Sequence, residues 1–304
     1  MDNPLFTIIT VTYNSSKYVR DAIESVLAST FQDFEYIIGD DCSSDNTWEI
    51  IEEYKDPRIV KYRNESNLRE YPNRNKAISM ATGEWILFID GDDIVFPHGL
   101  VVFAIYAKKF PNVGMIIQKT YQNNIVFPIV LEPISFLSNE FFDTTRLSCS
   151  SLTSNLFNRE KLNEIGLLPI EYITGDEFIR LKLGAEYNTL FISGFLTWPR
   201  ETPNQASSKI SYEKSLGERF EHIDFIIQNT RFDNSINKIH GAIFKKMRTE
   251  YIKFTFHQLK RLKFYRIYLF SQAYLKKFMF SSCSQEGIGI LEGHKPENPL
   301  KGSC

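Results

Sequence analysis

The 304-residue sequence lacks several features that mark common protein classes. Its four cysteines, Cys42, Cys149, Cys283 and Cys304, are far apart and show none of the short spacings of a zinc site. No apolar run reaches the roughly 18 residues of a membrane-spanning helix. The N-terminus has neither the basic nor the apolar region of a signal peptide. We therefore expect reduced thiols and a cytoplasmic location.

A strong charge of one sign is also missing. The formal net charge is −2, so the whole molecule has no electrostatic attraction for nucleic acid, and no nucleic-acid partner is expected. The first apolar segment is not followed by G-x-G-x-x-G, which excludes the redox enzymes that bind dinucleotides through that motif.

The most informative stretch is a junction between an apolar run and an acidic cluster. Residues 85–89 lead directly into Asp90-Gly91-Asp92-Asp93. Such a run predicts a strand buried on both faces of a parallel sheet. The acids then lie at the strand's carboxyl end, where open α/β sheets bind ligands. Crowded carboxylates indicate a hard divalent cation held together with substrate phosphates. The alternative is an acidic turn that caps the next helix.

Strand and helix patterns alternate along the first part of the chain. Apolar or β-branched runs predict strands at residues 6–12, 34–38, 59–62 and 85–89, with helical periodicity between them. This alternation predicts an α/β fold with a mostly parallel, doubly wound sheet flanked by helices. Right-handed crossovers would bring the strand ends near Thr12, Asp41 and Asp90 to one edge of the sheet.

The later elements are less regular. We predict a polar loop over residues 64–73, helices over 74–81 and 97–110, strands over 113–119, 152–157 and 189–198, and a helix that starts after Thr174. Residues 124–148 have no clear pattern.

The composition changes after residue 211. Between residues 240 and 280 there are ten Lys and Arg against one Glu, with aromatic residues interleaved. This predicts a helical, basic and aromatic C-terminal extension over 212–280, followed by a polar tail over 281–304. Two interpretations stay open: a helical hairpin that packs on the preceding domain, or helices that lie on an anionic membrane surface.

Several motifs, in order, resemble those of the family 2 glycosyltransferases with the GT-A fold. Residues 8–14 are similar to the family's first strand and Thr-Tyr-Asn turn, with Val11 at a frequent proline position. Residues 40–47 resemble its Asp-Asp-Gly-Ser-x-Asp-x-Thr segment, with Cys42 at the glycine position. Residues 73–78 and 81–85 resemble its Ala-Arg-Asn helix and Gly-Glu-Tyr entry. Asp90-Gly91-Asp92-Asp93 resembles its metal-binding motif, and Thr174-Gly175-Asp176-Glu177 lies where the family carries its base.

The resemblance covers residues 5–211 and implies a nucleotide-sugar-binding catalytic domain over residues 1–211. It implies that Thr12, Tyr13 and Asn14 contact the base and ribose of the donor, for which UDP is favoured. Asp41 would accept a hydrogen bond from the base. The alternatives are an ordinary turn after the strand and an Asp that caps its own loop.

The resemblance also implies how the reaction is assisted. Asp92 and Asp93 would hold Mn²⁺ or Mg²⁺ and the ribose, with Asp93 in direct contact with the metal, while Asp90 would orient the motif. Arg74 would reach the diphosphate, or would be an exposed helix arginine, and Arg200 would contact a phosphate. Asp176 is the expected general base of an inverting transfer; Glu177 competes for that role, and a simple helix N-cap is the alternative for Asp176.

The expected function is that of a hexosyltransferase. It would move a sugar from a nucleoside-diphosphate sugar to a hydroxyl of a saccharide or lipid-linked acceptor, in polysaccharide biosynthesis, at the inner face of the membrane. A sugar nucleotidyltransferase is an alternative, but residues 12–18 lack the Gly-rich, basic phosphate loop that it needs. A degenerate, non-catalytic binding module is another alternative, against which the intact acids argue. A processive synthase is disfavoured because no Gln-x-x-Arg-Trp motif occurs.

Overall fold

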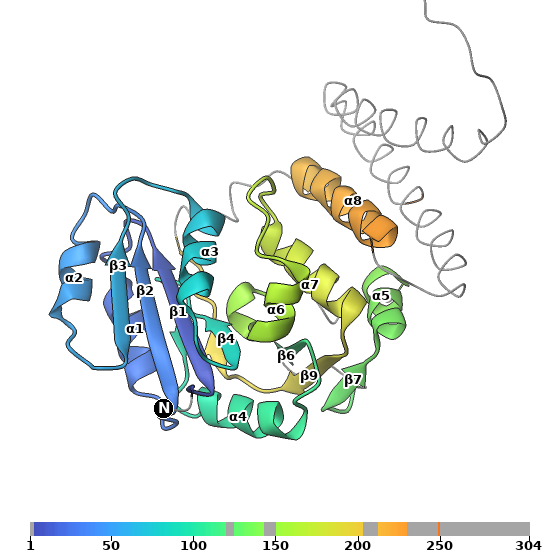
Figure 1. Ribbon diagram of the computed structural model, residues 1–304, viewed down its shortest axis with the longest axis horizontal. Helices are drawn as coiled ribbons and strands as arrows, with labels where there is room; N and C mark the ends of the chain where they lie inside the picture. The colour runs from blue at the N-terminus through green and yellow to red at the C-terminus, as the bar shows by residue number, and fades with distance from the viewer. Residues whose placement is uncertain (1–2, 120–124, 143–149, 203–211, 230–248, 250–304) are drawn as a thin grey trace, which may run out of the picture. The chain divides into compact units, whose positions relative to one another are not determined.

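The computed structural model describes residues 3–119, 125–142, 150–202, 212–229 and Thr249. The elements from β1 to α8 belong to one compact unit, residues 1–247 (Figure 1). Apart from Thr249, the basic segment between residues 240 and 280 and the tail over 281–304 lie outside the described residues. The predicted boundary between residues 211 and 212 stays a prediction.

The centre of the molecule is an eight-stranded sheet of order β3-β2-β1-β4-β8-β6-β9-β7. Strands β1 to β4, the first half of the sheet, are all parallel to their neighbours within this half, and β6 and β9 form a further parallel pair. Two strands run the other way: β8 is antiparallel to β4 and β6, and β7 is antiparallel to β9. The predicted mostly parallel α/β sheet is therefore confirmed. The strands are β1 (Phe6–Thr12), β2 (Phe34–Asp40), β3 (Ile59–Arg63), β4 (Trp85–Phe88), β6 (Met115–Lys119), β7 (Ile129–Leu131), β8 (Asn155–Asn158) and β9 (Thr189–Ser193).

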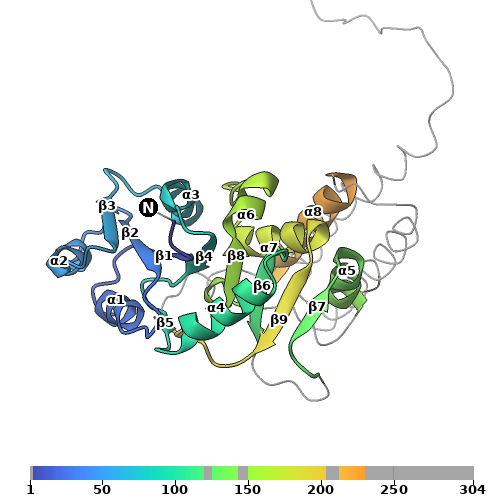
Figure 2. The same cartoon turned by 60° about the horizontal axis from the view of Figure 1, so that its bottom comes forward.

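Helices cover both faces of this sheet. Figure 2 shows α1 (Val19–Leu27) and α4 (Gly99–Lys109) on one side, and α3 (Glu70–Met80) and α6 (Arg159–Ile165) on the other. On α1, Val19, Ile23 and Val26 form the buried stripe expected of an amphipathic helix. The remaining helices are α2 (Thr47–Glu53), α5 (Pro133–Phe142), α7 (Gly175–Glu186) and α8 (Tyr212–Asn229). Within the described residues, no helix is both long and apolar enough to cross a membrane.

Strands β1 and β4 are buried at every position. Phe6 and Ile8 point to the core that α1 and α4 complete, while Ile9 and Phe88 are buried as well. Burial on both faces explains why these strands appear in the sequence as continuous apolar runs rather than as alternating patterns. It also fixes the strand ends, where the polar residues begin.

Tertiary contacts move several predicted boundaries. Helix α3 begins at Glu70, not at Arg74, because the Asp41 carboxylate holds the backbone just before it. The expected strand over 152–157 is divided into a 3₁₀ turn, η1 (Leu152–Ser154), and the short β8. The expected strand over 189–198 breaks at Gly194, and β10 (Thr197–Trp198) instead pairs with β5 (Ile94–Val95). Helix α4 begins two residues after Pro97. The segment without a clear pattern contains β7 and α5.

Candidate active site

The carboxyl ends of β1, β2 and β4 converge as predicted. The Asp41 backbone N–H donates to Thr12 O at 2.9 Å, which joins the ends of β1 and β2. A Cβ atom on Gly91 would lie 2.8 Å from Thr12 Oγ1, so the acidic motif touches the end of β1. Thr12 Oγ1 is buried and has no hydrogen-bond partner in the described part of the chain. Buried hydroxyl groups are normally paired, so this atom marks a place where a ligand would complete the site.

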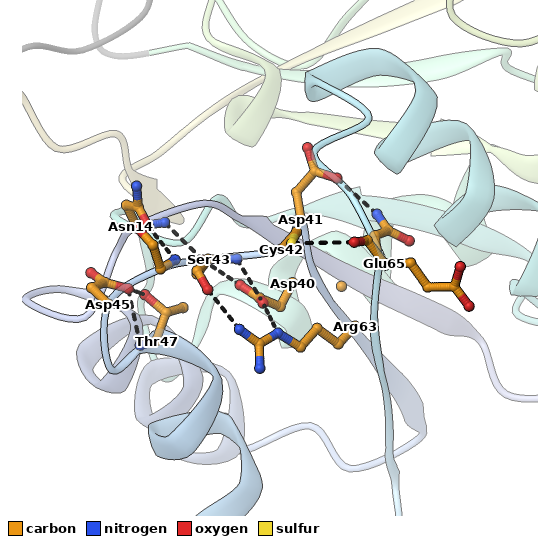
Figure 3. Close-up of polar contacts among 12 residues, drawn as sticks. Asn14, Asp40, Asp41, Cys42, Ser43, Asp45, Thr47, Arg63 and Glu65 are labelled. Carbon is orange, nitrogen blue, oxygen red and sulfur yellow. Dashed lines mark hydrogen bonds and ion pairs between the residues drawn. The ribbon is translucent and has the colours of Figure 1, made fainter.

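The loop after β2 is held by its own acids (Figure 3). The Asp40 carboxylate accepts hydrogen bonds from the Ser43 hydroxyl and backbone N–H, and it pairs with Arg63 Nε at 3.2 Å. Cys42 between them has a φ of 62°, in the left-handed region. An L-residue pays roughly 1–2 kcal/mol for this conformation. That cost explains why glycine suits this position of the motif, and Cys42 adopts the same backbone.

Asp41 points away from Asp40 (Figure 3). Its buried carboxylate accepts hydrogen bonds from Asn64 Nδ2 at 2.8 Å and from the backbone N–H groups of Leu68 and Arg69, both at 2.9 Å. Asp41 therefore anchors the loop that precedes α3. This differs from the alternative in the sequence analysis, an Asp that caps its own loop, because the groups that donate to Asp41 lie on another loop. The contact with a nucleotide base stays a prediction.

The turn after β1 is hydrogen-bonded to the loop after β2. Asn14 Oδ1 accepts a hydrogen bond from Ser44 N at 2.8 Å, and Asn14 N donates to Ser43 Oγ at 2.9 Å. The Tyr13 side chain beside it is half exposed. Of the three residues expected to contact the nucleotide sugar, Thr12 and Tyr13 present groups that a ligand could contact. Asn14 instead holds the loop after β2 through hydrogen bonds.

Arg74 is buried. The alternative from the sequence analysis, an exposed helix arginine, is therefore ruled out. The Arg74 guanidinium donates to both oxygens of Asp90, at 2.7 and 3.0 Å, and to Glu70 Oε1 at 2.9 Å. Such a two-bond fork fixes orientation as well as charge. Asp90 is thereby tied to α3, which fits the expected role of orienting the motif. A contact between Arg74 and the diphosphate stays a prediction.

Asp92 and Asp93 are the acids left for a cation. Asp92 Oδ2 accepts from the Thr202 hydroxyl at 2.9 Å; Asp93 accepts from the Thr153 hydroxyl and from Arg200 N, the latter at 3.0 Å. Burial, with the nearby Asp90 charge, raises the pKa of Asp93 to about 7, and burial raises the pKa of Asp92.

These two carboxylates fit Mn²⁺ or Mg²⁺. No group of three potential metal ligands occurs among the residues that the structure covers. Mg²⁺, however, is usually bound by one or two carboxylates together with substrate phosphates. A cation would also favour the charged form of two acids that burial disfavours. The donor set therefore suits a metal that arrives with a phosphate-bearing ligand.

The sequence analysis predicts only a phosphate contact for Arg200, and this contact stays a prediction. It predicts no role for Thr202. The Arg200 guanidinium lies over the rings of Tyr18 and Trp198 and pairs with Asp21 at 3.0 Å, while its backbone holds Asp93. The segment after β10 thus lies against the acidic pair. Nothing in the sequence around Thr202 or Thr153 signals these contacts, because each joins residues more than fifty positions apart.

Asp176 lies in the first turn of α7. The N-cap residue of that helix is Thr174, so Asp176 is not the N-cap. Its carboxylate is one-third exposed and pairs with Arg180 at 3.2 Å, whereas the neighbouring Glu177 pairs with Arg219 of α8. The N–H of the preceding Gly175 donates to the Tyr71 hydroxyl at 2.9 Å, which places this turn beside α3. Of the two acids, Asp176 has the more exposed side chain, at 33% against 16% for Glu177.

The family model for "Glycosyl transferase family 2" matches residues 7–166, more than half of the chain. A relative from Escherichia coli, the UDP-Glc:alpha-D-GlcNAc-diphosphoundecaprenol beta-1,3-glucosyltransferase WfaP, is 39% identical over 29% of this chain and 36% of its own length. The segments matched in four curated relatives make up 36–43% of those proteins.

Two solved structures share the fold. TarS from Staphylococcus aureus, crystallised with UDP-GlcNAc, has a TM-score of 0.58 and 21% identity over 77% of this chain and 69% of its own. The mannosyltransferase PcManGT from Pyrobaculum calidifontis, in complex with GDP-Man and Mn²⁺, has a TM-score of 0.57 and 14% identity over 94% of this chain and 76% of its own. The expected GT-A fold is therefore confirmed.

Proposed function

Because the chain belongs to glycosyl transferase family 2, we propose that it transfers a hexose from a nucleoside-diphosphate sugar to a hydroxyl group of a saccharide or lipid-linked acceptor. The observation that carries this proposal is the meeting of Thr12, Asp41 and the Asp92–Asp93 pair at one edge of the sheet. Open α/β sheets bind ligands at this edge. UDP is the proposed nucleotide, in line with the UDP-sugars named for WfaP and TarS.

The proposed donor site uses one side of this edge. Tyr13 and Asp41 would hold the base, the free Thr12 hydroxyl would donate to or accept from the donor, and Asp92 would meet the ribose. Arg74 would keep Asp90 neutralised, so that the two following carboxylates face the diphosphate. Mn²⁺ or Mg²⁺, held there by Asp92 and Asp93, would supply Lewis-acid stabilisation of the leaving diphosphate.

Asp176 is the proposed general base. It would take the proton of the acceptor hydroxyl while that oxygen bonds to the anomeric carbon from the face opposite the leaving nucleoside diphosphate. This displacement inverts the anomeric configuration. Asp176 pairs with Arg180 at 3.2 Å and keeps one-third of its side chain exposed, so an acceptor hydroxyl could reach its carboxylate.

The test is binding and transfer with a panel of nucleotide sugars, with and without Mn²⁺. A ligand that binds only the folded protein raises its melting temperature. We expect a UDP-sugar to stabilise the wild type in the presence of Mn²⁺, and chelation to abolish both the shift and sugar transfer. Asp93→Ala should lose transfer and the metal-dependent shift, while the exposed control Asp33→Ala should behave as the wild type.

Three results would contradict the proposal. Full transfer by Asp93→Ala, or in excess chelator, would remove the metal role. Formation of a nucleotide sugar from a sugar phosphate and a nucleoside triphosphate would indicate the nucleotidyltransferase alternative. Tight binding without any turnover, across acceptors of both classes, would indicate a binding module.

A further inference from the structure

The turn immediately before Asp176 is hydrogen-bonded to two residues that have no part in the proposed reaction. Residues 173–175 connect an exposed loop to α7, and they set the direction in which Asp176 leaves the backbone. Tyr71 of α3 holds this turn from one side and Glu218 of α8 holds it from the other. We call these three residues and their two partners the base clamp.

The Tyr71 hydroxyl bridges the two ends of the turn. It donates to Ile173 O at 2.7 Å and accepts from Gly175 N at 2.9 Å. The Tyr71 ring lies so close that a Cβ atom on Gly175 would be 3.0 Å from it and 3.1 Å from Pro169 O. Glycine at position 175 therefore permits an approach that any side chain would crowd.

Glu218 satisfies the remaining polar groups of the turn. Its Oε2 atom accepts from Ile173 N at 2.9 Å, from Thr174 N at 2.8 Å and from Thr174 Oγ1 at 2.8 Å. A buried carboxylate with three such donors forms charge-assisted hydrogen bonds, which are about twice as strong as neutral ones. It also lies at the N-terminus of α7, where the helix dipole favours negative charge.

The start of α7 is unusual in a way that the clamp explains. Thr174 is the N-cap residue, and threonine normally caps a helix through its own hydroxyl. Here its side chain makes no capping bond, and its hydroxyl donates to Glu218. The first turn of α7 is thus stabilised from outside, by a residue 44 positions away in the chain.

The clamp is linked to the acidic motif through α3. Glu70, next to Tyr71, accepts from Arg74, and Arg74 holds Asp90. One rigid helix therefore touches both the metal-binding motif and the turn that carries the proposed base. Reacting groups must be placed closely, because a misplacement of about 1 Å can cost roughly 10²-fold in rate.

We propose that Tyr71 and Glu218 are positioning residues, which hold Asp176 in register with the donor site. This inference rests on the proposed function, since it assumes that Asp176 accepts a proton. If it is correct, loosening the clamp lowers turnover without altering the donor contacts at the ends of β1, β2 and β4.

The test compares Tyr71→Phe and Glu218→Ala with matched controls. Tyr71→Phe removes one hydroxyl and keeps the ring. The controls are Tyr106→Phe on α4 and Glu221→Ala, an exposed residue of α8 one turn beyond Glu218. Amide hydrogen exchange over residues 170–178 reports the clamp directly, and exchange over residues 85–93 reports whether the sheet stays folded.

We expect faster exchange over 170–178, unchanged exchange over 85–93, a fall in kcat of roughly 10–100-fold, and a donor KM within about twofold of the wild type. The controls should change none of these quantities. Unchanged exchange in both variants would overturn the clamp itself. Faster exchange with an unchanged kcat would show that the clamp stabilises the fold but does not position the base.

Failure of the proposed function gives a different result. If the wild type transfers no sugar from any donor, the base role of Asp176 fails, and the positioning role fails with it. The exchange data would then still decide whether Tyr71 and Glu218 hold the turn, because they need no substrate.

Discussion

Asp176 and Glu177 are adjacent acids with different surroundings, and the difference supports the roles proposed for them. Glu177 pairs with Arg219 and has only 16% of its side chain exposed, whereas Asp176 keeps one-third of its side chain exposed. Loss of a positioned base typically costs ~10²–10⁴-fold in rate. We therefore expect Asp176→Asn to lose turnover by that factor while keeping its affinity for the donor. Steady-state kinetics with a matched binding measurement checks this.

Glu177→Gln is the comparison for that experiment. It should reduce turnover far less, because its carboxylate is engaged by α8. The anomeric proton coupling in the product, read by NMR, should show the configuration opposite to that of the donor. Near-normal turnover in Asp176→Asn, or a retained configuration, would remove the role of this residue.

Asp41 is predicted to serve both the loop and the nucleotide. Its carboxylate accepts three hydrogen bonds from residues 64–69, and a carboxylate oxygen has room for a further donor. Asp41→Ala should weaken binding of the free nucleoside diphosphate by about 1–3 kcal/mol, the usual effect of losing a hydrogen bond to a charged group. Calorimetry measures this directly, with Asp56→Ala, on the loop before β3, as the control. Equal affinities would leave Asp41 a loop residue only.

How far the sequence predicts the site depends on the separation between its residues. Asp92 and Asp93 follow a buried strand, so local pattern places them, and the crossover rule brings Thr12 and Asp41 to them. Tyr71 and Glu218 give no such signal. Their partners are 102 and 44 positions away, and each contact exists only once the helices are packed.

The same reasoning applies at the scale of elements. Strands β1 and β4 are predicted well because burial on both faces leaves an unbroken apolar run. The sequence does not predict the start of α3 or the turn before β8. Side-chain hydrogen bonds from distant residues, Asp41 and Asp93, fix these two places. Helix α8 is predicted as a helix, but its contact with α7 cannot be read from its charge pattern.

Arg219 joins three helices and provides a test of that contact. It pairs with Glu177 of α7 and, at 2.5 Å, with the buried Glu140 of α5. Removing one partner of a buried ion pair typically costs ~3–5 kcal/mol, because the other charge stays buried. We expect Arg219→Met to lower the free energy of unfolding by about this amount in urea titrations. Arg20→Met, which breaks an exposed pair with Glu53, should leave the urea midpoint close to that of the wild type, because exposed ion pairs contribute little to stability.

The decrease in the free energy of unfolding caused by Arg219→Met should depend on pH. Burial already raises the pKa of Glu177, and Arg219 opposes that shift. Without Arg219 the folded-state pKa rises further above the unfolded value, so the folded protein binds more protons. Stability then falls as pH rises through the folded-state pKa. The destabilisation should therefore be smaller at pH 5 than at pH 8, and equal losses at both would contradict the buried pair.

At the scale of the whole molecule, charge is distributed very unevenly. The formal net charge is −2, yet residues 240–280 carry ten Lys and Arg against one Glu, so this segment has +9 and the rest of the chain −11. A local excess of this size acts on nearby surfaces, because charges are screened within about 10 Å at ordinary ionic strength. The net charge of the molecule therefore does not predict how this segment behaves.

We expect this segment to bring the protein to anionic membranes, close to a lipid-linked acceptor. Each Lys or Arg near such a surface contributes about 1 kcal/mol, so a few that face the same way give measurable binding. The 304-residue protein should co-sediment with vesicles that contain anionic lipid, but not with neutral ones, and added salt should release it. Lys260→Glu/Arg261→Glu/Lys263→Glu should abolish this binding. The control Lys17→Glu/Lys55→Glu/Lys108→Glu changes the net charge equally but lies outside the segment, and it should still bind. Equal binding to neutral vesicles, or equal loss in both triple variants, would instead favour a helical hairpin that packs on the catalytic domain.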